Sequence, residues 1–146
     1  MENTSIQQNL YWQLFQVAIS TKHELMTTAE KYKLSVMQLY TLCLLDNKTS
    51  IPMNSLSSTL HCDASNVTGI VDRLLGQNYI VRAENPEDRR EKMIKLTAKG
   101  ARLCAKISTE INRTPPINVS QLSEKQKQQL SQILNDILTS KTSPKK

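Results

Sequence analysis

The feature that most constrains the fold is a stretch with helical periodicity and one polar face, followed closely by two short strand-like segments. After Asp63, a typical helix N-cap residue, apolar side chains recur at helical spacing as far as Leu75. The segments 79–84 and 92–96 are β-like and flank a loop that begins with Asn-Pro. We therefore expect a helix that leads into a β-hairpin with a charged tip.

Further helices are expected before this pairing. Residues 5–31 repeat apolar side chains three and four positions apart, which predicts a long helix with a broad apolar face. Ser35 and Gln38 form an S-x-x-Q capping box at the start of a second helix. That helix is apolar nearly all round and should be central. Pro52, whose fixed φ suits a first helical turn, marks a short helix that ends in a tight turn at His61.

Two more helices are expected after the hairpin. Thr97 can cap the first, which must end before the proline pair at 115–116. Ser123 and Gln126 form a second S-x-x-Q box at the start of the last helix. This order of elements predicts a mainly α fold with a small β-hairpin wing, namely a winged helix-turn-helix extended by helices at both ends.

Size and composition fit one soluble domain over residues 1–146, with residues 35–97 as its winged helix-turn-helix region. Hydrophobic residues make up 38% of the chain, which is enough for a single core. The longest apolar run, residues 42–45, is far shorter than the roughly 20 residues needed to cross a bilayer, and no leader segment is evident. We expect a cytoplasmic protein with no membrane partner.

The residues offer little for catalysis or metal binding. The three cysteines are odd in number and lack C-x-x-C spacing, which argues against a disulfide framework and a zinc site. Nucleotide-binding and nucleophile-elbow motifs are missing, and the two histidines have no evident catalytic partner. We therefore expect no enzyme activity, no metal and no cofactor.

The net charge of +6 is compatible with a nucleic-acid partner, but its distribution is uneven. Residues 1–60 hold four basic and four acidic side chains, and residues 61–100 hold seven and six. Residues 101–146 hold eight and three. Since most of the excess lies outside the helix and hairpin, DNA binding has to be argued from the placement of side chains.

The same residues resemble the MarR family of bacterial transcriptional regulators. The segment 65–74, SNVTGIVDRL, looks like the family's recognition helix, and residues 85–90 with 94–97 look like its wing. The resemblance implies a sequence-specific regulator of transcription that binds duplex DNA. His61 and Asn78 stand where glycine is usual, yet both tolerate the left-handed conformation that these turns require.

The resemblance also indicates which side chains would contact DNA. Short polar groups on the recognition helix can reach base edges or phosphates in the major groove. By analogy with the family, Arg90 would enter the minor groove, Asp88 would orient it, and Arg89 would contact phosphate. Arg73 would contact phosphate or brace the wing through an acidic residue such as Asp88. The full set of predicted DNA-binding residues is Ser65, Asn66, Thr68, Arg73, Asp88, Arg89 and Arg90. Alternatively, these residues form a solvated helix face and an ordinary charged loop.

A homodimer on a pseudo-palindromic operator is expected, because two copies read two half-sites about 10 base pairs apart. The helices at 5–31 and 98–140 would form the dimer, with Leu10, Leu14, Ile133 and Ile137 as contacts. The alternative is that these apolar faces pack within one subunit.

Family members commonly respond to small aromatic or anionic effectors or to cysteine oxidation. A ligand cavity could be lined by Trp12, Phe15, His23, Met26 and Tyr40, although we favour an ordinary core role for these residues. Cys62, in a turn before a helix, is the best redox candidate, whereas Cys43 and Cys104 lie on apolar stripes.

Our prediction is thus a ligand- or redox-responsive repressor. The main alternative is a winged helix that binds another protein as an antirepressor and does not bind DNA directly. Such a protein would not need Asn66, Arg89 or Arg90. Single-stranded RNA is a weaker option, because no aromatic side chain lies on the recognition helix or at the wing tip for base stacking.

Overall fold

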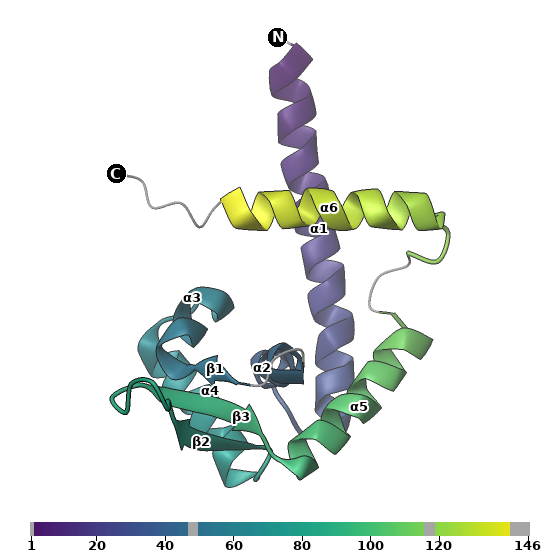
Figure 1. The fold of residues 1–146 in the computed structure, drawn as a ribbon. Coiled ribbons are helices and arrows are strands. Elements are labelled where there is room, and N and C mark those ends of the chain that lie inside the picture. The colour runs from purple at the N-terminus through teal and green to yellow at the C-terminus, as the bar shows by residue number, and fades with distance from the viewer. Residues whose placement is uncertain (1, 47–49, 116–118, 141–146) are drawn as a thin grey trace. The chain divides into compact units, whose positions relative to one another are not determined.

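The computed structural model describes residues 2–46, 50–115 and 119–140 (Figure 1). The described elements are α1 (Glu2–Lys31), α2 (Val36–Asp46), β1 (Ile51–Pro52), the 3₁₀ helix η1 (Met53–Ser55), α3 (Leu56–Leu60), α4 (Ala64–Gly76), β2 (Ile80–Glu84), β3 (Lys92–Leu96), α5 (Ala98–Arg113) and α6 (Glu124–Ser140). They fall into two compact units, residues 1–116 and residues 117–146. The mainly α winged-helix architecture predicted from the sequence is confirmed.

The predicted helix caps are present. The backbone N–H of Ser35 donates to Gln38 Oε1 at 2.7 Å, and the N–H of Gln38 donates back to Ser35 Oγ at 3.2 Å. The side chain of Asp63 accepts the backbone N–H of Asn66 at 2.9 Å and caps the start of α4. The side chain of Thr97 accepts the backbone N–H of Gly100 at 2.9 Å and caps the start of α5. The sequence-based starts of α2, α4 and α5 are therefore correct to within one residue.

The two turns that flank α4 close in the left-handed conformation without glycine. His61, which ends α3, has a φ of 50°, and Asn78, which follows α4, has a φ of 59°. The N–H of Tyr79 reaches back across the second turn to the carbonyl of Leu74 at 3.0 Å, which ties the end of α4 to the start of β2. These turns position the recognition helix between α3 and the wing, as the sequence predicted.

The core of the first unit is built around α2. Its residues Leu39, Leu42 and Leu45 are buried, and α2 packs on α1, α4, α5 and β3. The other buried hydrophobic side chains are Ala29, Leu34, Ile51, Leu56, Leu60, Val67, Val71, Leu74, Ile80, Ile94, Leu103, Cys104 and Ile107. The prediction that the second helix is central is confirmed.

The sheet has three antiparallel strands in the order β1-β3-β2, whereas the sequence predicted only the hairpin β2-β3. Ile51 pairs with Ile94, and Pro52 pairs with Met93. Pro52 has a φ of −59° and a ψ of 133°, so it is extended and precedes η1 rather than forming a first helical turn. A strand of two residues has no measurable alternation, which is why the sequence pattern missed it.

The second unit contains α6. The N–H of Ser123 donates to Gln126 Oε1 at 2.9 Å, and the N–H of Gln126 donates to Ser123 Oγ at 3.3 Å, which confirms the second capping box. None of the residues of α6 is buried. No helix in the described ranges has the length and apolar character required to cross a lipid bilayer.

Candidate nucleic-acid interface

The outward face of α4 is polar and exposed. Val67, Val71 and Leu74 point into the core, and the opposite face is formed by Ser65, Asn66, Thr68, Gly69, Asp72 and Arg73. This division follows from the 3.6-residue period that the sequence showed. The polar face is therefore available to a partner, as the prediction requires.

The side chains on this face differ in what they can offer. Ser65 Oγ donates to Asp63 Oδ1 at 2.8 Å, and Thr68 Oγ1 donates to the carbonyl of Ala64 at 2.9 Å. Both hydroxyls have used their single donor and retain acceptor capacity. Asn66 makes no side-chain hydrogen bond to any described residue, so its amide is free to donate and to accept. It is the side chain best suited to read a base edge.

Gly69 lies in the middle of the exposed face. A Cβ built on this residue would meet no heavy atom of the chain within 4 Å. Packing within the subunit therefore does not account for a glycine here, although glycine costs about 1 kcal/mol of helix propensity relative to alanine. The two explanations are close approach of an external partner to the backbone of α4 and a tolerated glycine on the surface.

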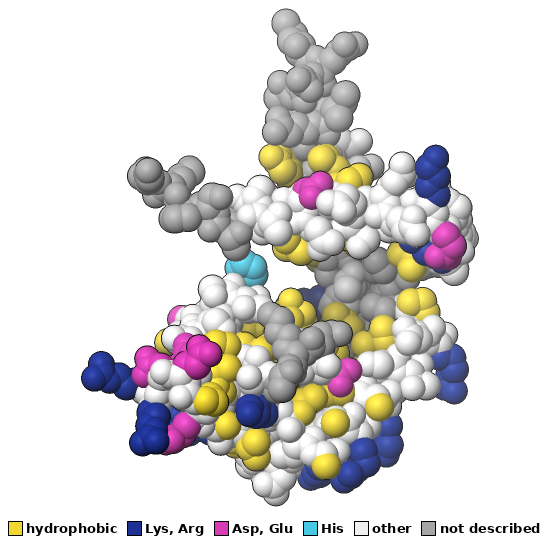
Figure 2. All heavy atoms as spheres, viewed as in Figure 1, with side chains coloured by type: hydrophobic (Ala, Val, Ile, Leu, Met, Phe, Trp, Pro, Cys, Tyr) yellow, Lys and Arg dark blue, Asp and Glu magenta, His cyan; other side chains and the backbone are white. Residues whose placement is uncertain are grey.

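The tip of the wing is shaped by two side-chain turns. Asn85 Oδ1 accepts the N–H of Glu87 at 3.0 Å, and Asp88 Oδ1 accepts the N–H of Arg90 at 2.9 Å. Asp88 thus fixes the backbone of Arg90 rather than its guanidinium group. Arg89 and Arg90 are exposed, and Figure 2 shows Lys and Arg side chains projecting at the end of the molecule where the β2–β3 loop lies in Figure 1.

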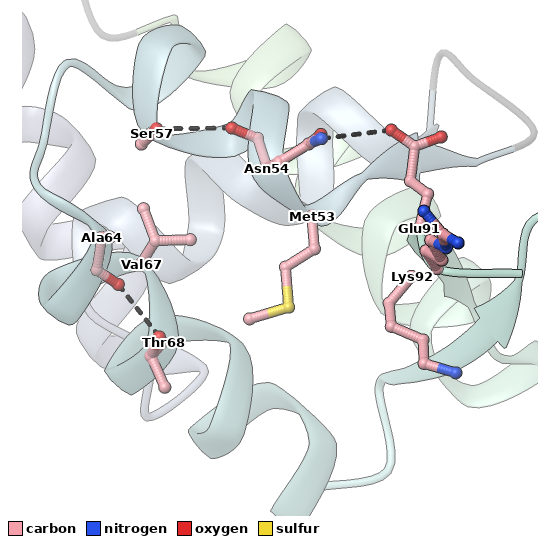
Figure 3. Close-up of a pocket in the computed structure, with 9 residues that line it drawn as sticks. Met53, Asn54, Ser57, Ala64, Val67, Thr68, Glu91 and Lys92 are labelled. Atoms are coloured by element: carbon pink, nitrogen blue, oxygen red, sulfur yellow. Dashed lines mark hydrogen bonds between the residues drawn. The ribbon is translucent and has the colours of Figure 1, made fainter. Parts of the chain in front are cut away.

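The base of the wing is held by Glu91, a residue that the sequence analysis did not single out. Its Oε2 accepts from Asn85 Nδ2 at 2.6 Å, and its Oε1 accepts from Asn54 Nδ2 at 3.2 Å (Figure 3). Its backbone N–H donates to the carbonyl of Asp88 at 3.0 Å, and its carbonyl accepts the N–H of Asn85 at 3.2 Å. Glu91 therefore closes the loop 85–91 and ties it to η1.

A groove separates the wing from the start of the recognition helix. Its volume is about 430 Å³, and its walls come from η1 and α3, from α4 and from the wing. The lining residues are Met53, Asn54, Ser57, Ala64, Val67, Thr68, Arg90, Glu91 and Lys92. In Figure 3, Thr68 lies on one side of the opening, and Lys92 lies on the other. The groove thus brings Thr68 and Arg90, two of the predicted DNA-binding residues, to one surface.

An ion pair connects α4 to the wing, but it does not involve Arg73. Arg82 Nη2 on β2 lies 2.6 Å from Asp72 Oδ1 on α4. Among the described residues, Arg73 forms no ion pair, so its bracing by Asp88 is not observed, and its guanidinium remains available for phosphate. The brace between α4 and the wing is thus made by Asp72 and Arg82, and not by Arg73 and Asp88.

The proposed ligand-pocket residues do not form part of the core of this chain. Trp12 and Phe15 are 67% and 55% exposed and contact each other edge to face, with ring centroids 6.0 Å apart. Met26, Tyr40 and His23 are also exposed. The ordinary core role that we favoured for these residues is therefore wrong. The reason is that helical periodicity identifies an apolar face but not what covers it. Of the five, Met26 lines a cavity of about 290 Å³ beside the α1–α2 turn.

The three cysteines differ in environment. Burial raises the pKa of Cys43, with a smaller effect of Asp46. Burial also raises the pKa of Cys104 to about 12, so its thiol stays protonated and unreactive. Cys62 is half-buried and lines a cavity of about 310 Å³ together with Ser65, Asn66 and Arg73. It is the cysteine nearest the polar face of α4.

The predicted dimer contacts are accessible. Leu10, Leu14, Ile133 and Ile137 are all at least 36% exposed, and so are Tyr11, Val17, Ile19, Leu130, Leu134 and Leu138. Within its own unit, each of the helices α1 and α6 therefore carries an exposed apolar face. Among the described residues, no group of three or more His, Cys, Asp or Glu side chains is arranged to hold a metal ion.

Comparison with known proteins points to one family. The MarR family model matches residues 34–92, from the end of the α1–α2 turn to the base of the wing. The chain is 34% identical over 71 residues to the multiple antibiotic resistance protein MarR of Salmonella typhimurium, which covers 49% of each protein. It is 29% identical over 73 residues to an uncharacterized HTH-type transcriptional regulator, YfiV, of Bacillus subtilis, which covers 50% of this chain and 46% of that protein. In these matches the chain spans about half the length of the curated relatives.

Solved structures share the fold over most of the chain. A MarR transcriptional regulator from Methanosarcina mazei matches with a TM-score of 0.78 at 20% identity, covering 91% of this chain and 96% of that one. A cysteine-to-serine mutant of Escherichia coli MarR, solved in complex with operator DNA, matches with a TM-score of 0.71 at 22% identity, covering 89% and 94%. Residues 34–92 thus match the model of the MarR family, and the fold over most of the chain is that of solved MarR winged-helix structures.

Proposed function

We propose that this protein is a repressor that binds duplex DNA sequence-specifically as a homodimer. The observation that carries the proposal is the pairing of an exposed polar face on α4 with a wing whose tip presents Arg89 and Arg90. An α-helix fits the major groove, and an arginine-tipped loop fits the narrow minor groove beside it. The solved complex of Escherichia coli MarR with operator DNA has the same fold.

The proposed roles follow from the hydrogen-bonding capacity of each side chain. The free amide of Asn66 can pair bidentately with adenine, and Arg73 can contact phosphate. Ser65 and Thr68, whose hydroxyl protons are used within α4, accept from base amino groups or bridging water. At the wing, Arg90 enters the minor groove on a backbone fixed by Asp88, and Arg89 contacts phosphate.

The exposed apolar faces of α1 and α6 support the homodimer. A monomeric soluble protein rarely leaves large contiguous apolar patches in water. A second copy of the same chain would cover them and present the second α4 and wing to the other half-site. Leu10, Leu14, Ile133 and Ile137 are the proposed contacts.

We further propose that a small aromatic or anionic effector, or oxidation of a thiol, releases the repressor from DNA. Met26 lines the cavity beside the α1–α2 turn, and it remains a candidate effector contact together with Trp12, Phe15, His23 and Tyr40. Cys62 is the candidate thiol, because a group added to it would lie beside Ser65 and Asn66 on the DNA-reading face. Repression lifted by peroxide but retained in Cys62→Ser would support the second route.

The test is selection of binding sites from random duplexes, followed by fluorescence anisotropy with the selected sequence. Arg90→Ala should weaken binding about tenfold or more, because it removes a minor-groove contact. Lys125→Ala on α6 removes the same charge and should change little. Failure of the wild-type protein to enrich any duplex sequence would reject the proposal and favour the protein-binding antirepressor.

A further inference from the structure

We propose that a cavity between the α1–α2 turn and the end of α4 is a binding site for a phosphate group. The cavity has a volume of about 550 Å³ and is lined by Glu30, Lys33, Leu34, Ser35, Gln38, Arg73 and Gln77. We call it the turn cavity. The phosphate can belong to the DNA backbone or to a small phosphate-bearing molecule, and binding experiments separate these two sources. Only the first source rests on the proposed DNA binding.

The central feature of the turn cavity is the side-chain amide of Gln38. This side chain is only 5% exposed, and its Oε1 accepts the backbone N–H of Ser35 at 2.7 Å in the capping box. The oxygen is therefore occupied, which leaves Nε2 for a partner in the cavity that Gln38 lines. Nε2 makes no hydrogen bond to any described residue, and packing does not seal it from solvent. A buried side chain with unused N–H donors requires an acceptor.

Further donors lie beside this amide at the start of α2. Ser35 Oγ accepts the N–H of Gln38 at 3.2 Å, and its own hydroxyl proton has no acceptor among the described residues. The first N–H groups of α2, a helix of 11 residues, carry the partial positive charge of the helix dipole. A phosphate group has three or more strongly accepting oxygens. It therefore suits a cavity in which donors come from several directions.

Two cations without an internal partner complete the lining. Lys33 and Arg73 are exposed, and neither forms an ion pair within the described residues. The backbone of Lys33 is fixed, because this residue closes α1 with a φ of 56° and its N–H donates to the carbonyl of Glu30 at 3.0 Å. The lining holds one carboxylate, that of Glu30, which pairs with neither cation. The net charge of the turn cavity is therefore positive, which favours an anion.

The turn cavity borders the polar face of α4 on the side away from the wing. Arg73 and Ser35 also line the cavity of about 310 Å³ that includes Asn66. Thr68, which lines the wing groove, is about 140° from Arg73 around the axis of α4 at 3.6 residues per turn. The major groove is bounded by a phosphate backbone on each side. With the wing at one backbone, we expect the other to pass the turn cavity. A free phosphate-bearing molecule in the same place would occupy Arg73 and oppose DNA binding.

The test uses variants that change the turn cavity and keep the helix cap. Q38E retains an oxygen for the N–H of Ser35, because glutamate also completes a capping box, but it replaces the free donor by an acceptor. K33Q removes one cation. K106Q removes the same charge at an exposed lysine of α5 and is the control. E30Q removes the carboxylate of the lining and should tighten phosphate binding. Circular dichroism shows whether each variant is folded.

Two titrations of the full-length protein separate the sources. In the first, inorganic phosphate is added at constant ionic strength, and NMR follows the backbone amides of residues 35–38. The shifts should saturate in the wild type, and K33Q and Q38E should weaken binding roughly tenfold, because each removes a charged or charge-assisted contact. In the second, fluorescence anisotropy measures duplex binding over a series of salt concentrations. The slope of log K against log salt should be less steep by about 0.9 in K33Q, with equal losses for operator and scrambled duplex.

Saturation by phosphate with an unchanged salt slope in K33Q identifies a free phosphate-bearing ligand, and a changed slope without saturation identifies the DNA backbone. Absence of both effects would overturn the inference. An effect of K106Q equal to that of K33Q would also overturn it, since loss of charge alone would then explain the result. If Q38E does not fold, K33Q and E30Q carry the test, and weaker phosphate binding by E30Q contradicts the site. Absence of any DNA binding by the wild type would reject the proposed function, whereas the phosphate titration would still decide on the turn cavity.

Discussion

At the residue scale, Gly100 and Gly69 have opposite reasons for being glycine. A Cβ on Gly100 would lie 2.0 Å from the carbonyl oxygen of Tyr79, so the start of α5 can pack on the start of β2 only without a side chain. A Cβ on Gly69 would meet nothing within the chain. The first glycine is explained by internal packing, whereas no contact within the described chain requires the second.

Gly100→Ala should destabilise the protein by about 1–3 kcal/mol, because the new methyl group overlaps backbone that cannot move aside easily. Gly69→Ala should instead stabilise it by up to about 1 kcal/mol through helix propensity. Urea unfolding followed by circular dichroism measures both. Gly69→Ala should also weaken operator binding, if α4 approaches DNA as proposed. A more stable variant that binds DNA as well as the wild type would remove that role from Gly69.

At the scale of elements, the orientation of the wing depends on Glu91. Its carboxylate joins the end of β2, through Asn85, to η1, through Asn54. The loop is also closed by the side-chain turns at Asn85 and Asp88 and by the backbone hydrogen bonds of Glu91 to these two residues. Removal of the Glu91 carboxylate therefore loosens the attachment of the loop to η1, while the core beneath it stays intact.

Glu91→Ala should weaken operator binding several-fold and change the unfolding free energy little, since hydrogen bonds on an exposed loop contribute about 0.5–1.5 kcal/mol each. Anisotropy titration measures the operator affinity, and thermal unfolding measures the stability.

Glu87→Ala is the matched control, because it removes the same charge from the same loop and its side chain makes no hydrogen bond to any described residue. Loss of a negative charge alone would strengthen DNA binding in both variants. Tighter binding by Glu91→Ala would thus contradict its role in positioning the wing.

The junction of α1 and α5 depends on Glu110. Hydrogen bonds from Lys31 and Tyr32 lower the pKa of this carboxyl below its ordinary value of 4.5. A carboxyl whose pKa is lower in the folded state contributes stability that is complete above the unfolded pKa. That stability is lost as the pH falls through the folded value. Because Lys31 is more than half exposed, solvent screens the pair, and the effect should be modest.

Urea unfolding of the wild type and Glu110→Gln at a series of pH values tests this assignment. The wild type should be the more stable of the two by a constant margin from pH 7 down to the ordinary pKa of 4.5, and the margin should shrink below it. A margin that grows on acidification would have the wrong sign for a carboxyl with a lowered pKa.

The sequence predicted those elements whose signal is local. The helix starts could be predicted because the side chains of Ser35, Asp63 and Thr97 accept backbone N–H groups only three positions further along the chain. The strand β1 and the ties made by Glu91 and by the Asp72–Arg82 pair were missed. Each of them depends on a partner that the chain brings near only after folding, such as Asn54, which is 37 positions before Glu91. Periodicity likewise identified the apolar faces of α1 and α6, but not that each face is left exposed within its own unit.

At the scale of the whole molecule, charge and apolar surface are separated along the chain. Residues 61–100, which hold α4 and the wing, are nearly neutral and contribute to one core, whereas α1 and α6 carry apolar side chains that their own units leave exposed. This separation is typical of a protein in which one region reads DNA and another holds two copies together. The DNA affinity of such a protein depends on assembly, because each copy reads only half of the operator.

Leu14→Glu and Ile137→Glu should therefore convert the protein into a monomer of 16.6 kDa and lower its operator affinity by orders of magnitude. A charge placed in an apolar interface has no partner there, and its desolvation opposes association. Analytical ultracentrifugation at micromolar concentration measures the mass, and circular dichroism shows whether α1 and α6 remain helical. Val81→Glu changes an equally exposed apolar residue on β2 and should leave the mass unchanged. Sedimentation of the wild type itself at 16.6 kDa would show that the two faces are not joined by a second copy, and the half-site argument would fail with it.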